Sequence, residues 1–127
     1  MTFVDTNVFM YAVGGPHPLR APARAFLFDA VERNEPLVTS AEVLQELLHA
    51  YLAVGRQATL DAALTLVSGC VHDIWPVEAA DVHLARALES EHPGLTARDL
   101  VHIACCHRRN VGRVMTYDRS LAAAMEG

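Results

Sequence analysis

Four acidic residues are spaced along the chain so that an α/β fold could bring them together: Asp5, Glu42, Asp99 and Asp118. Three of them follow short apolar runs, and Asp99 opens a stretch with helical periodicity. Carboxylates gathered at one edge of a sheet repel one another and raise each other's pKa. A divalent cation removes that repulsion, because Mg²⁺ and Mn²⁺ prefer oxygen ligands. Two such ions about 4 Å apart can hold a phosphodiester for in-line attack by water.

Each acid also has a purely structural explanation, as a helix cap or as a charge in the first turn of a helix. Glu46 lies four residues after Glu42, a like-charge spacing that destabilises a helix by roughly 0.2–0.5 kcal/mol. A metal near Glu42 would compensate for this repulsion, and so would solvation of Glu46. The candidate caps are Ser40 before Glu42, Thr96 three residues before Asp99, Asp118 for the last helix, and Asp5 for a turn through Asn7.

The elements that must position these acids can be read from short apolar runs and helical periodicity. Strands are predicted at residues 2–4, 37–39, 71–75 and 114–116. Helical faces are predicted at residues 23–31, 43–52, 60–67, 84–88, 100–107 and 121–125, with Gly55 and Gly69 ending the second and third. Strands that alternate with helices predict a three-layer α/β/α domain around a short parallel sheet. In such a sheet, sites lie at the carboxyl ends of the strands.

Composition narrows the class of protein. The chain has 127 residues, which predicts one domain, residues 1–127, and its net charge is −5. All ten basic residues are arginine, which excludes mechanisms that need a lysine. Three cysteines, two of them adjacent, do not suit a disulfide framework. No secretion signal or long apolar run stands out, so we expect a cytoplasmic protein that does not enter membranes.

The helical stretch at residues 100–107 contains two histidines and two cysteines. His102 and Cys106 have the i, i+4 spacing of two zinc ligands, but no partner pair with metal-site spacing exists elsewhere. We therefore expect the cysteines to be core residues. His102 lies one turn after Asp99 and is expected to line the same site. Tyr117, beside Asp118, could stack a base or simply pack in the core.

Four motifs, in order, resemble those of PIN-domain ribonucleases, and most closely the VapC toxins of prokaryotic toxin–antitoxin pairs. The resemblance spans nearly the whole chain. The motifs are Asp5-Thr6-Asn7-Val8-Phe9, Ser40-Ala41-Glu42-Val43-Leu44-Gln45-Glu46-Leu47, Ala97-Arg98-Asp99-Leu100-Val101-His102-Ile103-Ala104 and Thr116-Tyr117-Asp118-Arg119-Ser120-Leu121.

The resemblance implies a metal-dependent endoribonuclease that leaves a 5′-phosphate and a 3′-hydroxyl. It also implies a VapB-like antitoxin partner and a homodimer. One or two Mg²⁺ or Mn²⁺ ions would be held by Asp5, Glu42, Asp99 and Asp118. Thr6, Asn7 and Thr116 would orient the carboxylates or water, and Arg98 and Arg119 would contact RNA phosphates. Many family members carry a further acid where this chain has Ser120.

Three other classes of protein use acids at strand ends or share the fold. A haloacid-dehalogenase-like phosphatase needs a second Asp at the position of Asn7, together with a lysine, and a receiver domain also needs a lysine. The sequence excludes both. A catalytically silent PIN-like module that binds RNA or protein stays open as the alternative, although all four acids are present.

Overall fold

The computed structural model describes residues 1–126, which are built around four parallel strands in the order β3-β2-β1-β4. The strands are β1 (Thr2–Val4), β2 (Leu37–Ser40), β3 (Asp73–Trp75) and β4 (Arg113–Met115). Each forms at one of the predicted apolar runs, although β3 starts later and β4 starts one residue earlier than expected. In this register Val4 pairs with Met115 and Ser40 pairs with Trp75, so the strands end together at one edge.

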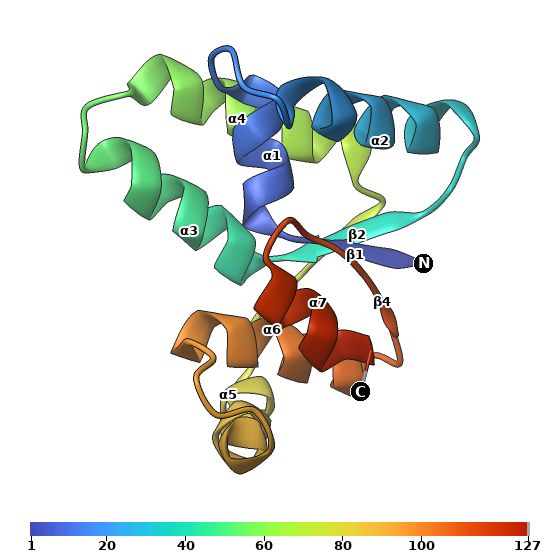
Figure 1. Cartoon of the computed structure of the whole chain (residues 1–127), viewed down its shortest axis with the longest axis vertical. Helices are drawn as coiled ribbons and strands as arrows, with labels where there is room; N and C mark the ends of the chain where they lie inside the picture. Colours follow the sequence, from blue (N-terminus) through green and yellow to red (C-terminus); the bar gives the residue numbers. More distant parts are fainter. Residues whose placement is uncertain (127) are drawn as a thin grey trace.

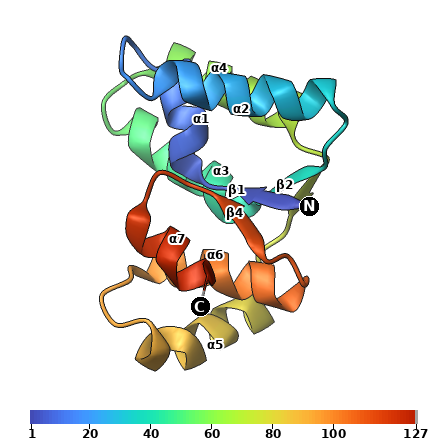
Figure 2. The ribbon, with the colours of Figure 1, turned by 45° about the vertical axis from the view of Figure 1, so that its right-hand side comes forward.

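Helices cover both faces of the sheet (Figures 1 and 2). On one side lie α1 (Thr6–Val13), α2 (Arg20–Glu32), α3 (Ala41–Leu52) and α4 (Gln57–Cys70). On the other side lie α5 (Ala79–Leu88), the short 3₁₀ turn η1 (Glu89–Glu91), α6 (Ala97–Arg108) and α7 (Arg119–Glu126). The predicted three-layer α/β/α arrangement is confirmed. No helix within residues 1–126 is both long and apolar enough to cross a membrane.

Two apolar cores hold the layers together. The larger core lies between the sheet and α1–α4, and it includes Phe3, Phe9, Leu27 and Leu47, all fully buried. Cys105 and Cys106 belong to it, as expected of core cysteines. The smaller core joins α5, α6 and α7 through Leu88, Leu100, Ile103 and Leu121. Burial of apolar side chains at about 25 cal/mol per Å² is the main term that fixes α3 and α6 relative to the sheet.

Three local predictions need correction. Helix α1 was not among the predicted helices, and it begins directly after Asp5, whose side chain caps it. Gly69 does not end α4 but lies inside it. Ser40 occupies the N-cap position of α3, yet its buried hydroxyl makes no hydrogen bond. Gly55 does follow the end of α3, with a left-handed φ of 69° that glycine adopts without strain.

An ionic cluster joins the start of α5 to the end of α6. The fully buried carboxylate of Asp81 accepts hydrogen bonds from Nη1 of Arg108 at 2.8 Å and Nη1 of Arg109 at 2.9 Å. The Arg109 guanidinium also lies over the Trp75 ring, 5.1 Å from its centroid. Burial alone would raise the pKa of Asp81, but these hydrogen bonds outweigh it and hold the pKa far below its usual range. The cluster fixes α6, and with it the first turn that carries Asp99.

Candidate active site

Asp5 is the centre of the site because three neighbouring elements hold its side chain. It directly follows β1 and is only 5% exposed. Its Oδ1 atom accepts a hydrogen bond from the Thr6 backbone N–H at 2.7 Å, which caps α1. Its Oδ2 atom accepts from Thr116 Oγ1 at 2.7 Å and from Asn7 Nδ2 at 3.4 Å. The carboxylate is thus fixed in one orientation before any ligand arrives.

The loop between β4 and α7 is tied to α1 by a short chain of hydrogen bonds. Oδ1 of Asn7 accepts from the Tyr117 backbone N–H at 3.1 Å. Thr116 Oγ1 accepts from the Asp118 backbone N–H at 3.0 Å. Oδ1 of Asp118 then accepts from the backbone N–H of Ser120 at 2.9 Å, so Asp118 caps α7 as predicted. The cap uses one carboxylate oxygen of Asp118, and the side chain also lines the pocket described below.

Glu46 and His102 complete the buried part of the site. Oε2 of Glu46 accepts a hydrogen bond from Thr6 Oγ1 at 3.0 Å, and Oε1 lies 2.6 Å from Nε2 of His102. The same Nε2 atom lies 3.6 Å from Oδ1 of Asp5. One ligand atom each from Asp5, Glu46 and His102 therefore lies within 4.8 Å of the others. These three residues come from the end of β1, from α3 and from α6.

The buried cluster contains Glu46 and does not contain Glu42, the acid of α3 that the sequence suggested. Glu42 lies in the first turn of α3, half-buried, and it is not among the residues that line the pocket. Glu46 is one helical turn further on, and it stands three residues after the fully buried Val43. This position borders the buried face of α3, which was the signal in the sequence that could have singled it out.

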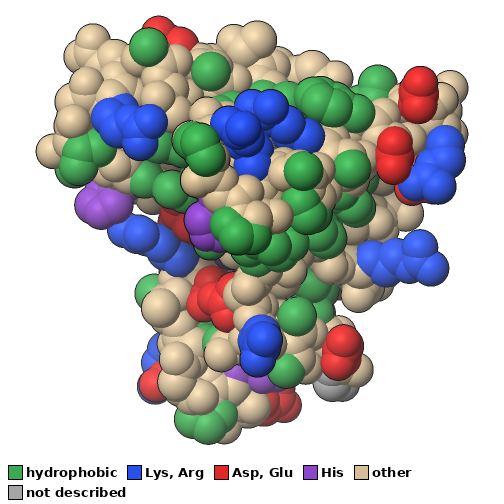
Figure 3. All heavy atoms as spheres, turned by 45° about the horizontal axis from the view of Figure 1, so that its top comes forward, with side chains coloured by type: hydrophobic (Ala, Val, Ile, Leu, Met, Phe, Trp, Pro, Cys, Tyr) green, Lys and Arg blue, Asp and Glu red, His purple; other side chains and the backbone are tan. Residues whose placement is uncertain are grey.

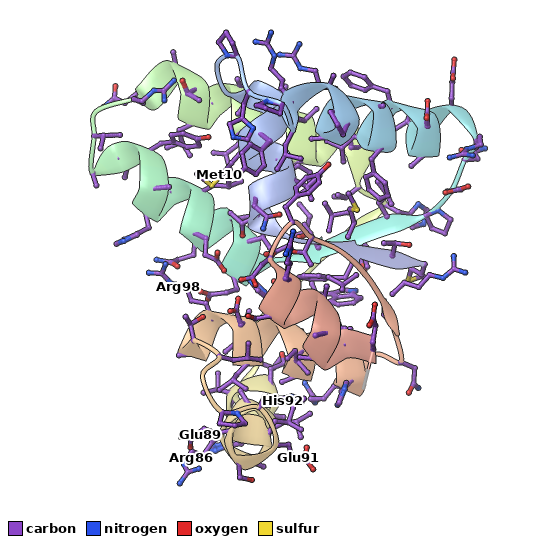
Figure 4. All side chains as sticks on the ribbon, in the orientation of Figure 1. Met10, Arg86, Glu89, Glu91, His92 and Arg98 are labelled. Atoms are coloured by element: carbon purple, nitrogen blue, oxygen red, sulfur yellow. The ribbon has the colours of Figure 1, made fainter. Side chains whose placement is uncertain are left out.

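Asp99 lies in the first turn of α6 and faces an open pocket of about 450 Å³. Its backbone N–H donates to Thr96 Oγ1 at 3.2 Å, which is one half of the expected capping box. The pocket is lined by Glu46, Thr96, Ala97, Arg98, Asp99 and Asp118. Figure 3 shows acidic side chains gathered at the waist of the molecule. Arg98 projects from the rim into open space (Figure 4).

The electrostatics of the site reflect this crowding of carboxylates. Burial raises the pKa of Asp5. Burial, followed by the nearby charges of Asp118 and Asp5, raises the pKa of Asp99. Burial alone would also raise the pKa of Glu46, but the hydrogen bond and charge of His102 outweigh it and lower that pKa. Burial opposes charge on His102, yet the Glu46 hydrogen bond raises its pKa. The His102 imidazole therefore offsets part of the negative charge of the site. The remaining negative charge lies on the carboxylates of Asp99 and Asp118.

A divalent cation fits this set of donors. Hard ions such as Mg²⁺ and Mn²⁺ take carboxylate oxygens, and here four carboxylates from four parts of the chain converge. Burial is the main cause of the raised pKa values of Asp5 and Asp99, and the crowding of carboxylates adds to the cost of holding their charges without a counter-ion. Among residues 1–126, Arg98 at the rim forms no ion pair with a carboxylate that would relieve this cost, although its charge helps to lower the pKa of Glu46. A cation between the carboxylates would lower this cost directly.

The sheet order, the layers and the acids at the carboxyl edge define the chain as a PIN domain. The PIN domain family matches residues 2–126, and the chain belongs to this family. Ribonuclease VapC23 of Mycobacterium tuberculosis is 64% identical over 124 residues, which cover 98% of this chain and 98% of that protein. Ribonuclease VapC13 of the same species is 40% identical over 119 residues, which cover 94% of this chain and 91% of that protein.

Two solved structures share the fold. The crystal structure of M. tuberculosis VapC20, described as a sarcin-ricin loop cleaving toxin, superposes with a TM-score of 0.77. It is 20% identical in sequence and the match covers 98% of this chain and 95% of that one. The structure of VapBC2 from Rickettsia felis, bound to a DNA fragment from their promoter, gives a TM-score of 0.68 at 16% identity. That match covers 92% of this chain and 86% of that one.

Proposed function

We propose that this chain is a metal-dependent endoribonuclease and the toxin of a VapBC-like toxin–antitoxin pair. The observation that carries the proposal is the convergence of Asp5, Glu46, Asp99 and Asp118 at one edge of the sheet. Relatives that match nearly the full chain are named ribonucleases, which supports RNA as the substrate. Asp99 and Asp118 line an open pocket, so a long, flexible polymer can reach these two acids from solvent.

Asp5, Glu46, Asp99 and Asp118 would hold Mg²⁺ or Mn²⁺, with Glu46 taking the place that the sequence suggested for Glu42. When bound, such an ion would provide positive charge at the phosphate and an activated water for attack on phosphorus. Thr6, Thr116 and Asn7 hold the buried carboxylates in place through hydrogen bonds of 2.7–3.4 Å. Such supporting contacts typically change metal affinity or activity by about 10–100-fold.

His102 acts on the acids rather than on the substrate. Its side chain is buried, and its Nε2 atom faces both Glu46 and Asp5. An N–H on Nε2 of His102 would hold Oε1 of Glu46 in place by a hydrogen bond. The carboxylates of Asp99 and Asp118 then remain to face the pocket. Arg98, at the pocket rim, supplies a cation for a phosphate of the RNA, since the chain has no lysine. We assign Arg119, at the start of α7, the same role.

An apolar groove of about 620 Å³ gives the antitoxin a place to bind. The groove lies between α1, α2 and α4, and Val13, Phe28 and Leu66 supply much of its apolar surface. Phe28 is 54% exposed, so a partner bound in the groove would bury an apolar ring. A homodimer would use the exposed Leu48 and Leu52 on α3. A toxin that cleaves cellular RNA works in the cytoplasm, and we place the chain there.

The test is cleavage of total cellular RNA by the purified chain with Mg²⁺ or Mn²⁺, beside the Asp99→Asn variant. We expect discrete fragments with 5′-phosphate ends that disappear with EDTA and with the substitution. Cutting that persists in Asp99→Asn would contradict the assignment of the site. Folded protein that binds Mn²⁺ and RNA without cutting would favour the catalytically silent module instead.

A further inference from the structure

A row of three aromatic rings leads away from the acids along α1. The Tyr117 and Tyr11 rings meet edge to face, with their centroids 5.6 Å apart and an interplanar angle of 85°. His17 forms the other end of the row, and the centroid of its ring lies 4.6 Å from the centroid of the Tyr11 ring. Tyr117 is the residue before Asp118, so the row starts directly beside the acid pocket.

The first two rings of this row are used for packing. Tyr117 and Tyr11 are half-buried, and the Tyr117 hydroxyl is buried without a hydrogen-bond partner. The position of Tyr117 is fixed by its backbone N–H, which donates to Asn7. Because Asn7 also contacts Asp5, the row of rings has a fixed place relative to the carboxylates. The sequence expectation that Tyr117 packs rather than stacks on a base agrees with this burial.

His17 differs from the tyrosines because it is exposed and yet held rigidly. It lies between Pro16 and Pro18 in the loop from α1 to α2, where both prolines restrict the backbone. Its Nδ1 atom accepts a hydrogen bond from the Leu19 backbone N–H at 3.0 Å. Its carbonyl oxygen accepts from the Arg20 backbone N–H at 3.1 Å. With one side of the ring toward Tyr11, the exposed remainder is a fixed aromatic surface.

We propose that His17, supported by Tyr11, is a stacking platform for one base of the RNA substrate, at the far end of the row of rings that begins at Tyr117. The proposal rests on the proposed ribonuclease function and adds a subsite to it. Single-stranded RNA is commonly held by bases that stack on aromatic side chains, histidine included. A ring held in place by its neighbours loses little freedom when a base stacks on it, which favours binding. The acids repel RNA until a cation is bound, so an aromatic contact away from the carboxylates adds to binding.

The test measures how tightly a fluorescein-labelled single-stranded oligoadenylate RNA binds to the full chain, by fluorescence anisotropy in the presence of Ca²⁺. We compare the wild-type chain with His17→Ala, with His17→Phe, which keeps an aromatic ring, and with His83→Ala. His83 is an exposed histidine on α5 and serves as the matched control. We expect His17→Ala to weaken binding about tenfold, whereas His17→Phe and His83→Ala stay close to wild type.

A second series of RNAs separates stacking from a merely structural effect. Each RNA has one base removed, at successive positions along the strand. We expect one position at which removing the base abolishes the difference between wild type and His17→Ala. Equal binding by His17→Ala and wild type would overturn the proposal, and so would a loss of the same size for every RNA in the series. No binding by the wild-type chain would overturn it too. Absence of RNA cleavage by the wild-type chain would instead count against the proposed ribonuclease function itself.

Discussion

Nε2 of His102 lies 2.6 Å from Oε1 of Glu46, and this contact joins α6 to α3 next to Asp5. The two residues are 56 positions apart in the chain. Their contact explains why Glu46 carries a lowered pKa in a site where Asp5 and Asp99 carry raised ones. It also supports our proposal that Glu46 is the acid of α3 that belongs to the site.

Substitution of each of the two glutamates of α3, Glu42 and Glu46, gives the sharpest test of which one belongs to the site. Glu46→Gln should lower the rate of RNA cleavage by about 100-fold or more, because it removes a charge within the cluster. Glu42→Gln should change the rate by no more than about threefold, since Glu42 does not line the pocket and affects the cluster only through longer-range charge. Both substitutions keep the size of the side chain. The measurement is the initial rate of RNA cleavage at saturating Mn²⁺.

A large loss in Glu42→Gln with an active Glu46→Gln would reverse this assignment. Circular dichroism and thermal unfolding of both variants serve as the control for folding. Each substitution leaves the apolar face of α3 unchanged, so we expect both variants to fold.

The metal-free chain should lose stability as the pH rises from the usual carboxylate range, about pH 4, through neutrality. The pKa values of Asp5, Asp99 and His102 are all raised in the folded state. A group with a raised pKa gives stability below its unfolded pKa, and that stability is lost as the pH rises through the folded value. We expect the free energy of unfolding to fall over this range with EDTA, and to fall less with Mn²⁺. Urea titrations at each pH measure it, and a flat profile with EDTA would contradict the account.

The ionic cluster around Asp81 should give the opposite pH dependence of stability, with stability lost at low pH. Its lowered pKa stabilises the fold above the usual carboxylate range, and this stability is lost as the pH falls through the folded value. Asp81→Asn should cost about 2–4 kcal/mol, because it leaves Arg109 and Arg108 without their buried partner. Chemical unfolding near neutral pH measures the loss. A variant as stable as wild type would show that the cluster is not needed to hold α5 on α6.

The cysteines of α6 should be inert in the folded chain. Burial raises the pKa of Cys105 to about 11 and that of Cys106 to about 12. The thiolate is the reactive form, so both should resist an aromatic disulfide reagent at about pH 8. We expect only the half-buried Cys70 to react before unfolding, and all three afterwards. Rapid reaction of the adjacent pair in the folded state would contradict the packing of α6.

Much of the architecture could be predicted because the patterns are local. The four strand sites, the helical face at residues 43–52 and the stop at Gly55 follow from apolar periodicity and one residue type. Helix α1 was missed because its start depends on the Asp5 side chain rather than on a periodic face. Gly69 was misread because the packing of α4 outweighs the low helix propensity of glycine.

The site was harder to predict than the fold. Motif spacing suggested Asp5, Asp99 and Asp118, and the structure places all three at one edge, Asp99 and Asp118 in the pocket and Asp5 beside it. The choice between Glu42 and Glu46 depends on the rotation of α3 against the sheet. That rotation is set by buried contacts of Val43 and Leu47 with distant parts of the chain. The partnership of Glu46 with His102 likewise needs the packing of α3 on α6, which spacing does not encode.

The most direct test of the account is Mn²⁺ binding measured by calorimetry on the wild-type chain and two variants. Asp99→Asn removes a pocket carboxylate, and Glu91→Gln removes an exposed acid at the far end of the molecule (Figure 4). We predict saturable binding that weakens at least about tenfold in Asp99→Asn and is unchanged in Glu91→Gln, together with a higher melting temperature of the wild-type chain in Mn²⁺. Equal binding by all three chains, or no shift in melting temperature at millimolar Mn²⁺, would contradict a metal site at this edge of the sheet.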